Sequence, residues 1–184
     1  MTHSNIYPFK TRPYAHQREA WELSRDKDEF ALFMDMGTGK SKVIIDNIAY
    51  LYDRGRIDSA LIIAPKGTYQ NWTRNEIPTH LPDHIVVKTA AWSASPRKEE
   101  KKDLENILFS LTDLRVLVMN IEAFSTTKGV KFAEQFIRCA GNTMMVVDES
   151  TTIKNPKAKR TKAVIKTGIQ AKYRRILTGE PVTR

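Results

Sequence analysis

A glycine-rich turn that ends in lysine and serine is the first part of the sequence that could do chemistry. Residues 34–41 read MDMGTGKS and stand between an apolar run and an amphipathic one. Such a turn surrounds phosphate oxygens with backbone N–H groups and a helix N-terminus, while its lysine neutralises charge and its hydroxyl coordinates Mg²⁺. Met34 stands where the strict pattern has its first glycine, so a glycine turn without a special role is the alternative. The expected phosphate contacts are Gly37, Thr38, Gly39, Lys40 and Ser41, with Ser41 also expected at the metal.

Two adjacent acids form the second group. Asp148 and Glu149 follow the apolar run MMVV, far along the chain from Ser41. The first acid would hold Mg²⁺ through water or Ser41, and the second would orient and deprotonate the attacking water in phosphoryl transfer. Alone, such a pair is often a solvated turn. Together with the glycine loop it predicts a nucleoside-triphosphate site in which Lys40, Asp148 and Glu149 are the catalytic residues.

These two groups need a scaffold that brings them to one place. Helical and strand patterns alternate along the chain, which predicts an α/β fold with a mostly parallel central sheet. The continuous apolar strands are typical of a sheet covered by helices on both faces. We expect strands over 30–34, 60–65, 84–88, 114–120, 144–148 and 173–179, and helices over 14–26, 43–54, 68–79, 95–111, 131–139 and 157–169.

The ends of the expected strands locate the site. Ligands of such sheets bind beyond the carboxyl ends of the strands. Three of these ends, after Met34, Val147 and Leu177, carry small or acidic residues. One shared crevice is therefore expected.

In the helix over 95–111, Ser95 is the expected cap and Pro96 the first helical residue.

Composition narrows the class of protein. With 184 residues we expect one domain over 1–184. No stretch approaches the roughly 18 to 20 apolar residues of a membrane span, and the N-terminus lacks a secretory signal, so a soluble intracellular protein is expected. The single cysteine, Cys139, excludes an internal disulfide and is expected to be a small buried hydrophobe.

The net charge of +9 is concentrated at the C-terminal end. Residues 150–184 hold ten Lys and Arg against Glu180 alone, while the preceding residues are balanced. Such a stripe suits a polyanion, because Lys and Arg that neutralise phosphates release counterions. A helix face exposed to solvent would also account for these charges. Composition alone therefore leaves two interpretations of the basic segment, a nucleic-acid contact or an ordinary solvated helix.

Four segments together resemble a known family. MGTGKS, LIIAPKGTYQNW, VVDESTTIKN and ILTGEP occur in the order and spacing of the first lobe of superfamily 2 helicases, and most resemble the Snf2-like group. The resemblance covers nearly the whole chain and implies a RecA-like P-loop NTPase domain. It further implies a DNA-dependent ATPase with ATP and Mg²⁺ as cofactors and double-stranded DNA as the partner.

In this superfamily ATP sits between two RecA-like lobes, and the second lobe supplies arginine fingers. The resemblance therefore implies a second RecA-like lobe from a longer parent chain. We expect weak nucleotide binding and negligible turnover from the present chain alone.

The resemblance also implies roles for single residues. Residues 1–26 resemble the Q motif, in which Gln17 would hydrogen-bond the adenine edge. Thr178 and Gly179 lie in the motif that couples ATP state to nucleic-acid grip, with Thr178 bonding back toward the acidic pair. Glu180 stands where the family usually has threonine, and Ser150 and Thr151 also depart from the usual box.

Other residues are implied at the nucleic acid. Lys66 and Thr68 would face its phosphates, Ser125 or Thr126 are weaker candidates, and Trp72 is expected in the core. Lys154 and Asn155 follow the acidic box and open the basic segment. We hypothesise that this segment lines the nucleic-acid path or the face that meets the second lobe, through Lys154, Lys157, Lys159 and Arg160.

Three other functions compete with duplex translocation. A strand-separating DNA or RNA helicase of the same superfamily would carry the same motifs. A non-catalytic DNA-binding module could retain the nucleotide pocket, although Lys40, Asp148 and Glu149 are all present. A small-molecule kinase would need an arginine-rich lid and would leave the IKN and LTGEP elements unexplained.

Overall fold

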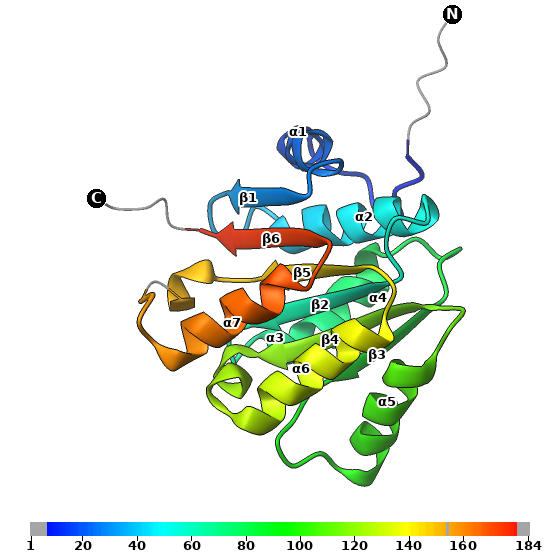
Figure 1. Ribbon diagram of the computed structural model, residues 1–184. Coiled ribbons are helices and arrows are strands. Elements are labelled where there is room, and N and C mark those ends of the chain that lie inside the picture. The colour runs from blue at the N-terminus through cyan, green and yellow to red at the C-terminus, as the bar shows by residue number, and fades with distance from the viewer. Residues whose placement is uncertain (1–6, 154, 180–184) are drawn as a thin grey trace, which may run out of the picture.

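The sheet is parallel throughout. The computed structural model describes residues 7–153 and 155–179, and six strands of this part of the chain form one sheet (Figure 1). From edge to edge the order is β1 (Glu29–Phe33), β6 (Tyr173–Thr178), β5 (Thr143–Val147), β2 (Ser59–Ala64), β4 (Leu114–Asn120) and β3 (Val87–Ala91). Because every neighbouring pair is parallel, the carboxyl ends of all these strands lie on the same side of the sheet, which is called its carboxyl edge.

Helices cover both faces of the sheet. Figure 1 shows one group behind it and another in front. The first group comprises α1 (Ala15–Ser24), α2 (Lys40–Asp53), α3 (Tyr69–Asn71), the π-helical turn η1 (Trp72–Glu76) and α4 (Ile77–His80). The second comprises α5 (Lys98–Phe109), the 3₁₀ turn η2 (Ile121–Ser125), α6 (Thr127–Cys139), the 3₁₀ turn η3 (Ser150–Ile153) and α7 (Lys159–Ile169).

The two faces bury separate cores. Alternate residues of a strand point to opposite faces, so Ile62 packs with the first group of helices and Leu61 with the second. Both side chains are fully buried. The expected sheet with helices on both faces is confirmed.

The third strand and the environment of Cys139 differ from the prediction. The expected strand over 84–88 is β3, which begins only at Val87, because Ile85 closes a turn through its N–H to the Pro82 carbonyl (3.1 Å) and Val86 is exposed. β3 is an edge strand, and its sequence VKTAA mixes polar and apolar residues, so the apolar pattern did not indicate it.

Cys139 is exposed at the last position of α6, since Phe136 and Ile137 take the core-facing positions.

The helix expected from Ser95 starts later. Arg97 is the N-cap of α5, and its backbone N–H bonds the Glu100 carboxylate (2.8 Å). A glutamate at the third helical position satisfies this otherwise unpaired donor, so the helix begins where Glu100 can reach back. Ser95 and Pro96 precede the helix and do not cap it.

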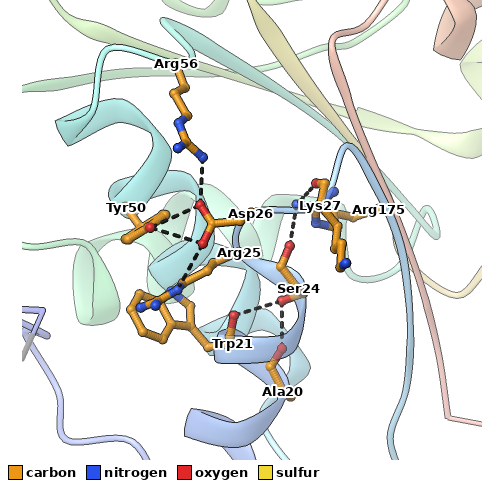
Figure 2. A network of polar contacts seen from close by, with 9 residues as sticks. All are labelled: Ala20, Trp21, Ser24, Arg25, Asp26, Lys27, Tyr50, Arg56 and Arg175. Atoms are coloured by element: carbon orange, nitrogen blue, oxygen red, sulfur yellow. Dashed lines mark hydrogen bonds and ion pairs between the residues drawn. The ribbon is translucent and has the colours of Figure 1, made fainter.

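A polar network fixes the carboxyl end of α1 (Figure 2). Asp26 accepts hydrogen bonds from the Tyr50 hydroxyl (3.1 Å) and the Arg56 guanidinium (2.7 Å). The buried Arg175 of β6 donates to the backbone carbonyls of Ser24 (2.9 Å) and Lys27 (2.7 Å). The end of α1 is thereby tied to α2 and β6, which fixes where its amino end lies.

Candidate functional site

The glycine loop joins β1 to α2 at the carboxyl edge of the sheet. Gly37 and Gly39 have φ angles of 76° and 83°, which side chains rarely adopt. Gly39 is the N-cap of α2 and no side chain caps this helix. The first N–H groups of α2 therefore point toward the loop, where an anion could accept from them.

Lys40 and Thr38 hold the loop in shape. The Lys40 ammonium donates to the carbonyls of Met34 and Asp35, each at 3.0 Å. The Thr38 hydroxyl donates to the Asp35 carbonyl at 2.7 Å. Ser41 is half-buried in the first turn of α2. The ammonium thus lies over the loop, where it can meet phosphate charge.

Gln17 of α1 packs on this loop. Its amide nitrogen donates to the Thr38 carbonyl (3.0 Å), and its amide oxygen accepts from the Tyr14 N–H (3.0 Å). A His16 ring nitrogen also lies 3.0 Å from the Thr38 carbonyl. A Cβ on Gly39 would collide with the Gln17 side chain. Gln17 is therefore a buried partner of the loop, and its contact with adenine stays a prediction.

The acidic pair follows β5 at the same edge. Burial raises the pKa of Asp148, while a hydrogen bond from Trp72 and the charge of Lys40 act in the opposite direction. Asp148 follows β5 and Lys40 lies after β1, and these two strands flank β6, so the two residues lie at neighbouring strand ends. Glu149 has a φ of 51°, an unusual value for a residue with a side chain and one that concentrates at functional sites.

The end of β6 lies between the glycine loop and the acidic pair, because β6 is the strand between β1 and β5. The Thr178 carbonyl accepts from the Met34 N–H (3.3 Å), and Thr178 is buried. A Cβ on Gly179 would lie 2.8 Å from Met36 Cγ and 3.5 Å from the Lys40 ammonium. The structure therefore brings Gly179 against the glycine loop. The bond from Thr178 to the acidic pair stays a prediction.

A hollow lies at the same edge, beyond β2, β4 and β3. It is a cleft of about 560 Å³. Lys66 lines it, whereas Thr68 lies outside it and donates its hydroxyl to the Pro65 carbonyl (3.3 Å). Their contact with nucleic-acid phosphates stays a prediction. Sequence reasoning missed Trp92 and Asn120, which also line the cleft. The end of the apolar run over 114–120 was the signal that could have indicated Asn120.

The weaker candidates at this edge have different environments. Thr126 lines the cleft, but its hydroxyl also caps α6 by accepting from the Gly129 N–H (3.0 Å). Ser125 is exposed. Lys154 lies outside the described residues, and Asn155 accepts from the Lys157 N–H (3.0 Å) in the turn before α7. Since α7 leads back to the start of β6, its basic first turn lies at the carboxyl edge (Figure 1).

Comparison with known proteins identifies the family. A family model described as the SNF2-related domain matches residues 14–184. The chain belongs to the SNF2-related domain family. This agrees with the resemblance seen in the sequence, and the expected Snf2-like first lobe is confirmed.

Relatives of this SNF2-related domain are much longer proteins. ATP-dependent helicase FUN30 of Saccharomyces cerevisiae is 29% identical over 161 residues, which are 87% of this chain and 13% of the relative. Protein CHROMATIN REMODELING 24 of Arabidopsis thaliana is 28% identical over 182 residues, 94% of this chain and 16% of the relative. The chain thus spans less than a fifth of either protein.

A solved structure shares the fold of the SNF2-related domain. The Sulfolobus solfataricus SWI2/SNF2 ATPase core in complex with dsDNA matches with a TM-score of 0.70 at 21% identity. The match covers 98% of this chain and 35% of that one. The RecA-like α/β fold is confirmed. Within the described residues, no helix is long and apolar enough to cross a membrane.

The residues of this SNF2-related domain fit a magnesium nucleotide. Mg²⁺ prefers oxygen ligands and shares them with substrate phosphates. The Ser41 hydroxyl is one oxygen donor, and Asp148 offers the carboxylate oxygen that Trp72 does not contact. Two left-handed glycines and a helix without a side-chain cap form the cradle for the phosphates.

Proposed function

We propose that this domain is the ATP-binding lobe of a DNA-dependent ATPase that translocates on double-stranded DNA. What carries the proposal is that the Lys40 loop, Asp148 and Gly179 follow β1, β5 and β6, three strands that end side by side at one edge of the sheet. A glycine turn with no special role would not need an acid from β5 and a glycine from β6 beside its lysine.

Each residue of this edge then has a chemical task. Backbone N–H groups from Gly37 to Ser41 bind the phosphates, and Lys40 exchanges the loop carbonyls for phosphate oxygens. Ser41 and Asp148 would hold Mg²⁺, which would neutralise phosphate charge when bound. Glu149 orients the attacking water and accepts its proton. Gln17 reads the adenine edge while it supports the loop.

The nucleic acid is proposed to bind beyond β2, β4 and β3. The cleft there is lined by Lys66, Tyr69 and Asn120, so it offers a cation, an aromatic ring and an amide. The basic segment with Lys157 and Lys159 lies at the same edge and adds charge that suits phosphates. The Sulfolobus core was solved with dsDNA, which supports duplex DNA as the partner.

Hydrolysis is proposed to require a second RecA-like lobe. Arginine fingers of related NTPases accelerate hydrolysis by about 10³ to 10⁵. A lobe that carries only the phosphate loop and the acidic pair would bind ATP and turn it over very slowly. DNA would act on the rate only when both lobes enclose the nucleotide.

Nucleotide binding and turnover of the present chain test the proposal. A fluorescent ATP analogue should bind in the presence of Mg²⁺, and Lys40→Ala should weaken binding by about tenfold or more, the value of a charged hydrogen bond. Lys131→Ala, on the exposed face of α6, is the matched control and should bind like the wild type. Hydrolysis should stay near background with duplex DNA. Equal affinity of all three proteins, or rapid DNA-stimulated turnover, would refute the proposal.

A further inference from the structure

Trp72 does more than pack in the core. Its side chain is 2% exposed and lies among the apolar residues of the first core, as expected from the sequence. Its indole N–H also donates to Oδ2 of Asp148 at 3.3 Å. The residue therefore connects the segment after β2 with a carboxylate of the proposed ATP site.

The backbone around Trp72 is unusual. Trp72 opens the π-helical turn η1, in which the Ile77 N–H bonds the Trp72 carbonyl five residues back. Pro78 lacks an N–H for the regular pattern. Such wide turns are rare and occur frequently at functional sites. Here the turn lies on the route from the cleft to Asp148.

The end of β2 and the segment that follows it together hold Asp148 at two atoms. The backbone N–H of Asp148 donates to the Ile63 carbonyl of β2 at 2.7 Å, and Trp72 binds its carboxylate. Any shift of residues 63–72 therefore acts on both the position and the orientation of Asp148.

The outer side of the same segment lines the cleft. Lys66, Tyr69 and Gln70 form one wall of it. Tyr69 and Trp72 are three residues apart in a helical turn, so they lie close together on its surface. Tyr69 lines the cleft and is largely buried, and Trp72 is buried in the same core as Tyr69. One short helical segment thus connects the cleft with Asp148.

We propose that Trp72 is a positioning residue that transmits occupancy of the cleft to the Asp148 carboxylate. This inference rests on the proposed function. An indole N–H is only a donor and does not titrate, so it fixes one carboxylate oxygen and leaves the other available for a metal. Hydrogen bonds of this kind orient metal-ligating carboxylates, and their loss typically costs 10-fold to 100-fold in metal affinity or activity.

The first test compares how Mg²⁺ strengthens nucleotide binding in two variants. Trp72→Phe keeps an aromatic ring and removes the N–H. It should reduce the Mg²⁺-dependent gain in affinity about tenfold and leave metal-free nucleotide binding unchanged. Trp21→Phe is the matched control, because Trp21 is 3% exposed and its indole nitrogen has no hydrogen-bond partner among the described residues. A merely structural role of Trp72 would change both affinities or neither.

The second test uses the indole N–H signals in proton–nitrogen NMR spectra of the whole chain. The chain has three tryptophans, and each signal is assigned by its loss in a Trp→Phe variant. Asp148→Asn should shift the Trp72 signal and leave the Trp21 signal in place. A duplex DNA oligonucleotide should shift the signal of Trp92, which lines the cleft, and that of Trp72 together.

The outcomes separate the inference from the proposed function. If wild-type protein binds the magnesium nucleotide but Trp72→Phe keeps the full Mg²⁺ effect, the inference fails and the proposed ATP site stands. A DNA-induced shift of Trp92 without one of Trp72 also overturns the inference. If DNA moves neither signal, the cleft is not the DNA surface. The proposed role of Trp72 and the proposed DNA-binding role of the cleft are then both wrong. If the wild-type protein does not bind the magnesium nucleotide, the proposed function itself is refuted.

Discussion

Lys42 and Asp46 form an ion pair inside α2, directly behind the phosphate loop. The ammonium lies 2.6 Å from Oδ2 of Asp46, and the two side chains are 5% and 1% exposed. The other carboxylate oxygen of Asp46 is buried and has no hydrogen-bond partner among the described residues. Burial raises the pKa of Asp46 to about 6, against the lowering effect of Lys42. The cost of desolvation therefore exceeds the gain from pairing.

This raised pKa predicts a pH dependence of stability. A carboxyl group with a pKa near 3.9 in the unfolded chain and about 6 in the folded one binds its proton more tightly when folded. Its contribution to the unfolding free energy is fully present below pH 4 and is lost as the pH rises to about 6. Urea unfolding of the wild type and Asp46→Asn at several pH values measures it. The wild type should lose stability relative to the variant between pH 4 and 6, and a relative gain there would show that Lys42 outweighs burial.

Residue types predicted which side chains could do chemistry, but not what each side chain contacts. Lys40 and Asp148 were predicted to share one site because parallel strands end at one edge. The bond from Trp72 to Asp148 could not be predicted, since it depends on the register of β2 and β5 and on a π-helical turn. The contact of Gln17 with Thr38 depends likewise on how α1 lies over the loop.

At the scale of elements, the position of α1 depends on one buried arginine. Arg175 is 1% exposed, and it donates to backbone carbonyls at the end of α1 and to Asn47 of α2 (3.1 Å). Burial lowers its pKa to about 10, although a guanidinium remains charged at neutral pH. The Ser24 carbonyl also accepts from the Lys27 N–H (3.1 Å), and Arg175 adds a charged donor to it and to the Lys27 carbonyl, as a helix cap would.

Replacement of this arginine should loosen α1 before the rest of the fold. In Arg175→Met the carbonyls of Ser24 and Lys27 both lose a charged donor. The Ser24 carbonyl keeps the Lys27 N–H, whereas an unsatisfied group such as the Lys27 carbonyl costs about 1–3 kcal/mol. Hydrogen exchange should therefore increase most in α1, where Gln17 supports the loop, and less in β2 and β5. Lys172→Met, an exposed neighbour at the start of β6, is the control and should exchange like the wild type. Uniform acceleration in all elements would contradict a local role of Arg175.

Element boundaries show what the sequence pattern could not predict. The central strands β2, β4 and β5 are buried on both faces and are the most apolar runs, so they were found within a residue or two. β3 was displaced because an edge strand can be half polar and because Ile85 is buried in a turn. The start of α5 depends on the Glu100 carboxylate, a contact that competes with the cap expected at Ser95.

At the scale of the whole molecule, the parallel topology gathers the functional groups. Strand order β1-β6-β5 brings three distant parts of the chain, around Lys40, Asp148 and Gly179, to adjacent strand ends. Strand order β2-β4-β3 forms the cleft at the same edge. The alternation of helices and strands predicted this common edge, although it could not predict the strand order. The half of this edge formed by β1, β6 and β5 suits a nucleotide, and the half formed by β2, β4 and β3 suits a polyanion.

The basic segment provides the test at this largest scale. Lys157 and Lys159 are exposed at the carboxyl edge, so Lys157→Glu with Lys159→Glu should weaken duplex DNA binding. If both contact phosphates, the slope of log affinity against log salt should become less steep by about 2, close to one per lost contact. Lys27→Glu with Lys172→Glu changes the net charge equally but at the opposite edge, where both side chains are exposed. The control should keep the wild-type slope, because only contacts that release counterions contribute to it. Identical slopes for the two double variants would mean that net charge alone attracts DNA and that this segment does not line its path.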